Sequence, residues 1–243
     1  MRTSPTETVK FMRTCSTPFA ALLVILGSAC NSSLLNGRMD EGVIEYALTF
    51  PDHDPNGLMA GMLPESTTLT FADDKQLAEL SAGMGIFRTH MVVDNKGRAM
   101  DYHMSMMSKK IMSHLVPRDL DVINTGIPKP YLLFTNDVDT IAGFECKRAV
   151  AIFDRMDLPE VDIWYTTDID LDNANWFGPF SEVPGVMLSY EMVQYGLRMR
   201  LDAVKVTPSK VDPSQFNEKP EYERVDPAVL HHDMAEVLGA FSM

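Results

Sequence analysis

The sequence predicts a mainly β protein built on an antiparallel sheet that curls or closes on itself. Three observations lead to this prediction. From position 42 onward the apolar residues recur mostly with a period of two, which is typical of half-buried strands. Turn residues separate these segments at hairpin spacing, and a helical pattern occurs at the carboxyl end. Eight or more strands joined by hairpins, with little helix, indicate such a sheet.

Length and composition set the broad class. The chain has 243 residues, of which 45% are apolar and 23% charged. This length predicts one domain, and this apolar fraction rules out wholesale disorder. Lys and Arg number 21 against 34 Asp and Glu, a net charge of −13. This balance argues against nucleic-acid binding, which needs clustered cations to neutralise phosphates.

The amino terminus is a targeting segment. Basic residues precede a short apolar run at 19–26, and small residues follow it up to Cys30. This order predicts a secretory signal over residues 1–29. A cysteine directly after the small residues resembles a bacterial lipoprotein signal, in which the new amino-terminal cysteine carries lipid. The favoured location is therefore the periplasm, with the protein anchored to the outer membrane through lipid on Cys30.

An alternative stays open at this cleavage site. Gly27 and Ala29 also suit ordinary signal peptidase, which would leave a soluble periplasmic product. In either case residues 30–40 are expected to form a tether and residues 41–243 a single β-rich domain. Cys146 is the cysteine that stays in this domain, and we expect it to be a small apolar strand residue and not a catalytic thiol.

The first half of the domain contains strands joined by tight turns. Ile44, Tyr46 and Leu48 share one face of the first strand, as the period of two requires. A hairpin turn is expected at 94–97, where the asparagine and the glycine tolerate positive φ. The strands expected here lie at 42–50, 67–71, 77–81, 87–93 and 100–106.

The second half continues the pattern and ends in a helix. Three prolines within 109–130 forbid one long element there, so this segment stays undecided. Asp226 is expected to cap a helix with Pro227 in its first turn. The strands expected in this half lie at 131–135, 144–153, 161–166, 186–192 and 197–204.

Three clusters in the second half carry a family resemblance. They are Gly143-Phe144-Glu145-Cys146-Lys147, then Trp164-Tyr165-Thr166, then Gly178-Pro179 followed by Val183-Pro184-Gly185-Val186-Met187-Leu188. In this order they resemble the GLPGLI family, exported proteins common in Bacteroidetes, and its close uncharacterised relatives. The resemblance implies the fold of periplasmic lipoprotein carriers of the LolA and LolB type. That fold is a curved antiparallel sheet or half-barrel with one or two helices packed on the concave side, enclosing an apolar cavity.

The motifs of common enzymes are missing from the sequence. It has no His-Glu-x-x-His helix, no Cys-x-x-Cys pair, no nucleophile elbow, no phosphate loop and no dinucleotide fingerprint. Asp168, Asp170 and Asp172 alternate as in a calcium loop, but Asn173 stands where that loop needs glycine. A solvated acidic loop is the favoured interpretation. We therefore expect a protein that is not an enzyme, with no cofactor and no metal.

Methionine is the unusual feature of the composition, with 18 in the chain. The segment 100–114 combines methionine with histidine, which suits Cu(I). On a strand, however, Met104 and Met106 point to one face and His103 to the other, so the copper ligands would not converge. The methionines then either fill the core or line a cavity that adapts to an apolar guest.

These features together predict a protein that binds a lipid or another apolar ligand in the concave face of its sheet. The first alternative is an adaptor with a solidly packed sheet that binds an envelope protein, and the second is a Met/His copper-binding protein. The residues expected to line the ligand site are Tyr46, Leu48, Met100, Tyr102, Met104, Met106, Trp164, Leu188, Met199 and Leu201.

Overall fold

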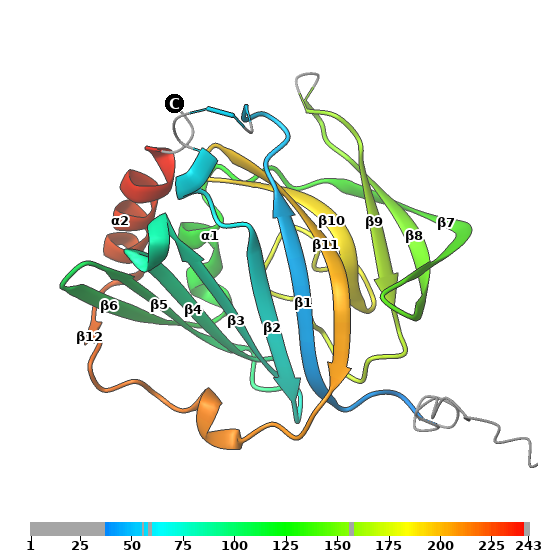
Figure 1. The fold of residues 1–243 in the computed structure, drawn as a ribbon, viewed down its shortest axis with the longest axis horizontal. Helices are drawn as coiled ribbons and strands as arrows, with labels where there is room; N and C mark the ends of the chain where they lie inside the picture. The colour runs from blue at the N-terminus through cyan, green and yellow to red at the C-terminus, as the bar shows by residue number, and fades with distance from the viewer. Residues whose placement is uncertain (1–36, 55, 58–59, 156–157, 241–243) are drawn as a thin grey trace, which may run out of the picture.

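The computed structural model describes residues 37–54, 56–57, 60–155 and 158–240 (Figure 1). The secretory signal, Cys30 and most of the 30–40 tether lie outside these residues. Strands hold 49% of the residues and helices 15%, so the mainly β fold is confirmed. Among the described residues, no helix is long and apolar enough to span a bilayer.

Twelve strands form one sheet in the order β12-β6-β5-β4-β3-β2-β1-β11-β10-β9-β8-β7. Every neighbouring pair is antiparallel except β12 and β6, which run parallel. The sheet does not close into a barrel. The strands are β1 (Glu41–Thr49), β2 (Ser66–Ala72), β3 (Lys75–Ala82), β4 (Phe87–Asp94), β5 (Ala99–Met106), β6 (Lys109–Leu115), β7 (Tyr131–Ile141), β8 (Phe144–Ile152), β9 (Val161–Thr166), β10 (Val186–Gln194), β11 (Leu197–Pro208) and β12 (Glu223–Arg224).

The segment 109–130, undecided from sequence, divides into a strand and a short helix. Its first part forms β6, and α1 (Leu120–Ile123) follows a 3-10 turn that starts at Pro117. Proline suits that place because the first turn of a helix needs no N–H from it. No pattern in the sequence predicted the two-residue strand β12.

The hairpin between β4 and β5 turns differently from the expectation. Positive φ falls on Arg98, at 49°, and not on Asn95 or Gly97. The Gly97 N–H donates to the Asp94 carboxylate at 2.6 Å, so the aspartate side chain closes the turn. A Cβ at position 97 would lie 2.8 Å from an Asp94 oxygen, so a larger residue there would have to displace the carboxylate that closes the turn.

Helices pack on the inner, concave face of the sheet, as expected (Figure 1). The second helix is α2 (Pro227–Gly239), and the Asp226 side chain caps it by accepting from the Ala228 N–H at 2.9 Å. Leu230 and Met234 of α2 pack with Met104 of β5. The helix thereby fills one end of the concave side.

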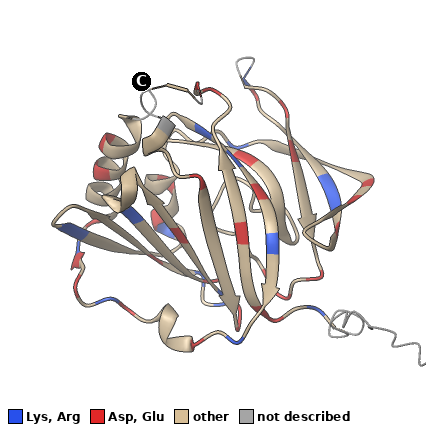
Figure 2. Ribbon diagram, in the orientation of Figure 1, with Lys and Arg blue, Asp and Glu red and all other residues tan. Residues whose placement is uncertain are grey.

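The outer face of the sheet carries charge and a covering segment. Glu45 of β1 and Lys205 of β11 pair at 3.2 Å, and Figure 2 shows acidic and basic residues side by side on these strands. Farther along the sheet, the chain after β11 crosses the outer side, where Phe216 packs with Leu77 and Val92. The inner face is thus the one that remains for an internal site.

Candidate functional site

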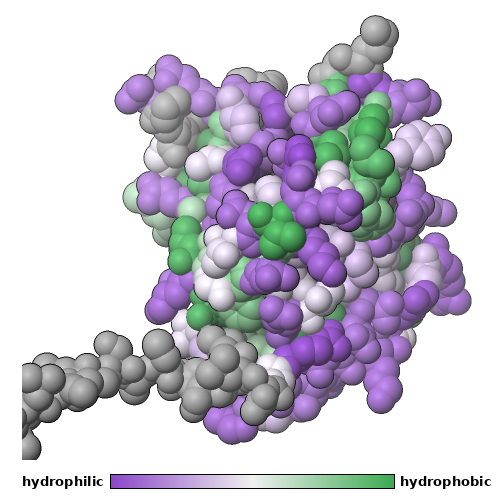
Figure 3. Space-filling model, turned by 90° about the vertical axis from the view of Figure 1, so that its right-hand side faces the viewer, coloured by the Kyte–Doolittle hydropathy of each residue, from purple (hydrophilic) through white to green (hydrophobic). Residues whose placement is uncertain are grey.

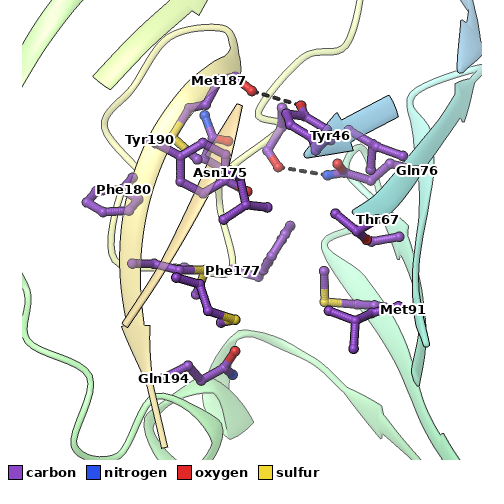
Figure 4. Close-up of a pocket in the computed structure, with 18 of the residues that line it drawn as sticks. Tyr46, Thr67, Gln76, Met91, Asn175, Phe177, Phe180, Met187, Tyr190 and Gln194 are labelled. Atoms are coloured by element: carbon purple, nitrogen blue, oxygen red, sulfur yellow. Dashed lines mark hydrogen bonds between the residues drawn. The ribbon is translucent and has the colours of Figure 1, made fainter. Parts of the chain in front are cut away.

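A cavity of about 230 Å³ lies inside the curve of the sheet (Figure 4). Strands β1 to β5 form one wall and β10 with β11 the other. Residues 123–127, at the end of α1, and the loop 174–180 between β9 and β10 complete the lining. The sheet encloses this space because its curvature brings strands that are far apart in the order of the sheet to face each other.

Six of the ten side chains predicted to line a ligand site lie on the wall of this cavity. They are Tyr46, Leu48, Met100, Tyr102, Met199 and Leu201. They come from three strands, β1, β5 and β11, and each lies on the face that the period of two assigned to the interior. The alternation along the strands was therefore sufficient to find them.

Met104 and Met106 do not line the cavity. Both lie on the expected inner face of β5, but they pack in the cluster that α2 covers. Met104 is only 1% exposed, against Leu230 and Met234. The strand pattern gave the correct face and could not show which part of it a helix would cover.

Leu188 and Trp164 also lie outside the cavity lining. Leu188 is fully buried in a core cluster with Cys146 and Ile169, and Trp164 packs partly buried against the same cluster. A register shift in β10 between Met187 and Ser189 puts Met187 on the cavity wall in place of Leu188. A bulge of this kind reverses the faces locally, so alternation alone could not assign them.

Sequence reasoning missed the part of the lining that comes from loops and polar side chains. Asn175 and Phe177 belong to the loop 174–180, and Gln76 lies on β3 among apolar neighbours. The burial of Gln76 and Asn175 could not be predicted, because the hydrogen bonds that satisfy their amide groups are made only in the folded structure. No periodicity marks a loop that folds back over a sheet.

Five methionines lie on the cavity wall: Met91, Met100, Met187, Met192 and Met199. The unbranched thioether side chain has three rotatable bonds, so it can repack around guests of different shape. The wall is therefore adaptable as well as apolar.

Three phenols face this interior and stay neutral. The Tyr46 hydroxyl donates to the Met187 carbonyl at 2.8 Å. Burial raises the pKa of Tyr46 and of Tyr102 well above the ordinary value, and burial raises the pKa of Tyr190 to about 12. Among the described residues that line the cavity, none is Asp, Glu, Lys, Arg or His. The wall accordingly offers hydrogen-bonding groups without charge.

Three amide side chains hold the loop 174–180, which we call the covering loop, in place. Gln76 donates from Nε2 to the Ala174 carbonyl at 2.7 Å. Asn175 donates to the carbonyls of Val183 and Gly185 at 3.0 and 2.8 Å, and Asn124 donates to the Phe177 carbonyl at 3.0 Å. These bonds satisfy loop carbonyls that burial would otherwise leave unpaired. The loop is therefore a fixed part of the wall.

The groups considered for metal binding are dispersed. His103 is fully buried on the outer side of β5 against Tyr222, with ring centroids 4.9 Å apart, whereas Met104 lies on the inner side. Arg38 pairs with Asp170 at 2.8 Å. No group of three or more His, Cys, Asp or Glu is placed to hold a metal within the part of the chain that the structure describes.

Cys146 is buried in the same cluster as Leu188. Burial raises the pKa of its thiol to about 11, so the reactive thiolate is scarce at neutral pH. The side chain occupies its place as a small apolar residue.

No protein-family model and no curated protein matches this chain. The resemblance to the GLPGLI family therefore stays a prediction. The solved structure of PNGF-II in its P21 crystal form superimposes with a TM-score of 0.51 at 17% identity, covering 81% of this chain and 33% of PNGF-II. Its C2 form gives 0.50 at 17% identity, covering 81% and 32%. This chain thus spans about a third of the length of the PNGF-II structures.

The complex of MucA and MucB from Pseudomonas aeruginosa is a more distant match. Its TM-score is 0.32 at 9% identity, covering 77% of this chain and 59% of that chain. A score this low supports no conclusion about this protein. The likeness to PNGF-II is to its fold alone, and it agrees with the mainly β architecture described above.

Proposed function

We propose that this protein is an exported, lipid-anchored, non-enzymatic protein that binds an apolar ligand inside the curve of its sheet. The observation that carries the proposal is the uncharged cavity of about 230 Å³, whose wall holds five methionines and three tyrosines. Pockets for small molecules are typically apolar with a few placed polar groups, and this wall has that composition.

The size of the cavity limits the guest. Small-molecule sites commonly measure about 300–1,000 Å³, and an engineered apolar cavity of about 150 Å³ binds benzene. At about 230 Å³ the present cavity suits a small apolar molecule or a section of an acyl chain. Each methylene transferred from water into it contributes about 0.8 kcal/mol.

Export and lipid anchoring rest on the amino-terminal segment. Residues 1–29 have the order of a secretory signal, and Cys30 follows directly. The domain itself is acidic, so we assign membrane attachment to the lipid and not to a basic patch. Mass spectrometry of the amino-terminal peptide from the native envelope tests this point, because an unmodified Cys30 or an intact residue 1 would contradict it.

Native mass spectrometry tests ligand binding. Protein purified from membranes should carry adducts of defined mass, and organic extraction should release small apolar molecules from it. Displacement of a fluorescent apolar probe by the extract should follow one-site behaviour. A clean protein mass together with no probe binding would overturn the proposal.

The edge strand β7 favours a second candidate, an adaptor that binds an envelope protein. Tyr131, Leu133 and Val138 on this strand are 73%, 56% and 57% exposed. Figure 3 shows apolar patches on this side of the molecule. An unpaired, apolar strand edge is a template for pairing with another chain. Cross-linking from position 133 in intact cells should capture one abundant protein if this candidate is correct, and lipid alone or nothing if it is not.

A further inference from the structure

Two polar side chains in the cavity wall are almost completely buried. Gln76 of β3 is 4% exposed and Asn175 of the covering loop is 9% exposed, and both line the cavity. Figure 4 shows them with Tyr46 at one end of the cavity, and Gln194 at the other. We call Tyr46, Gln76 and Asn175 the polar end.

The amide of Gln76 has both of its N–H donors engaged. Its Nε2 donates to the Ala174 carbonyl at 2.7 Å and to the Asn95 side-chain oxygen at 2.9 Å. Because a main-chain carbonyl can only accept, the nitrogen must point at Ala174, and this fixes the orientation of the amide. The Oε1 atom of Gln76 is left as an acceptor, and no described residue donates to it.

Asn175 repeats this arrangement. Its Nδ2 donates to two main-chain carbonyls, those of Val183 and Gly185, so both donors are engaged and Oδ1 remains. Neither the Gln76 Oε1 nor the Asn175 Oδ1 is among the fully enclosed polar atoms without a partner. Both oxygens therefore keep accessible surface, and the cavity is the space that these two residues line.

The third member of the polar end also offers an acceptor. The Tyr46 hydroxyl donates its hydrogen to the Met187 carbonyl at 2.8 Å, so the lone pairs of the hydroxyl oxygen remain to accept a hydrogen bond. The polar end thus presents three oxygens as acceptors, with its donors already engaged. No cation is found among the described lining residues.

We infer that the ligand carries a neutral hydroxyl or N–H group that donates to this polar end, and that fatty-acid carboxylates and other anions are rejected. The inference deepens the proposed function and rests on it. A donor satisfies buried acceptors that otherwise lack a partner, and this gives preference among apolar molecules of equal size. A carboxylate brings negative charge against acceptor oxygens with no counter-ion, and burial of an unpaired charge is costly.

A series of four molecules with eight carbon atoms each tests the inference on the natural protein. The probes are 1-octanol and octanamide as donors, methyl heptanoate as an acceptor of similar size, and octanoate as the anion. Each competes with a fluorescent apolar probe at neutral pH. We expect the two donors to bind about tenfold more tightly than the ester, and octanoate to be the weakest of the four.

Matched variants locate the effect. Gln76→Met removes one of the three acceptors while keeping an unbranched side chain, so the preference for 1-octanol over methyl heptanoate should fall well below tenfold. Gln194→Met, at the opposite end of the cavity, should keep the preference near tenfold. Circular dichroism checks that both variants are folded, and the series on the natural protein decides the question if Gln76→Met does not fold.

The outcomes separate the two proposals. Binding of the ester or of octanoate as tightly as 1-octanol would overturn the donor inference and leave the ligand-binding function standing. Absence of binding for all four chains and for the probe would overturn the proposed function itself. Loss of the preference in Gln194→Met, with its retention in Gln76→Met, would overturn the assignment to the polar end.

Discussion

Filling the cavity from its floor should make the protein more stable and weaken ligand binding. Ala78 lies on the inner face of β3 and lines the cavity, between Leu69 of β2 and Met91 of β4 in the register of the sheet. Ala78→Leu adds three carbon atoms, each contributing about 0.8 kcal/mol when buried, or about 2.4 kcal/mol in all. Lost rotamer freedom offsets about 0.5–1 kcal/mol of this gain.

The expected net gain is therefore about 1.5 kcal/mol in the free energy of unfolding. For a chain of this length such a gain raises the Tm by roughly 3–6 °C. Urea denaturation followed by circular dichroism measures the free energy, and probe titration measures the accompanying loss of affinity. The gain depends on free volume beside Ala78, which the cavity of about 230 Å³ supplies.

Ala149→Leu is the matched control. Ala149 lies on β8, is fully buried and packs in a dense cluster with Ile163 and Val183. The same three carbon atoms have no room there, so the variant should lose about 1–3 kcal/mol through overpacking. If Ala78→Leu destabilises the protein as much as Ala149→Leu does, the interior is solidly packed and the reasoning for a ligand cavity is refuted.

Three further predictions concern single side chains. Tyr46→Phe leaves the Met187 carbonyl without its donor and should cost about 1–3 kcal/mol in urea denaturation, whereas no change would show that water replaces the bond. Burial lowers the pKa of His103 below its ordinary value of 6.5, so the unfolded chain takes up the proton first and stability falls as the pH drops below 6.5. His103→Phe should flatten this fall between about pH 7.5 and about pH 5.5, and equal slopes in both proteins would contradict the assignment. Cys146, with its pKa raised to about 11, should resist iodoacetamide in the folded protein and react in urea, as peptide mass spectrometry would show; rapid labelling of the folded protein would contradict its burial.

The strands were predictable because each carries its own periodicity. Leu197, Met199 and Leu201 alternate with polar residues over a segment long enough to show which face is buried, and the structure buries all three. The Asp226 cap was equally local, since the aspartate and the helix that it caps adjoin in sequence. The predicted cavity residues were wrong where contacts or pairing with distant segments decide the outcome. Helix α2 covers Met104, and the bulge in β10 places Met187 on the cavity wall in place of Leu188.

Sequence alone determined that the chain folds as a curved sheet of hairpins, which side of most strands faces inward, and that the amino terminus has the pattern of an export signal. Those properties follow from neighbours a few residues apart. Only the tertiary structure decided that the inward side chains leave a cavity and that its polar end presents acceptors. The carbonyl of Ala174 that orients Gln76 comes from a loop 98 residues farther along the chain. The direction of such a hydrogen bond and the volume left between side chains depend on how distant segments pack together, so the pattern within one segment cannot predict them.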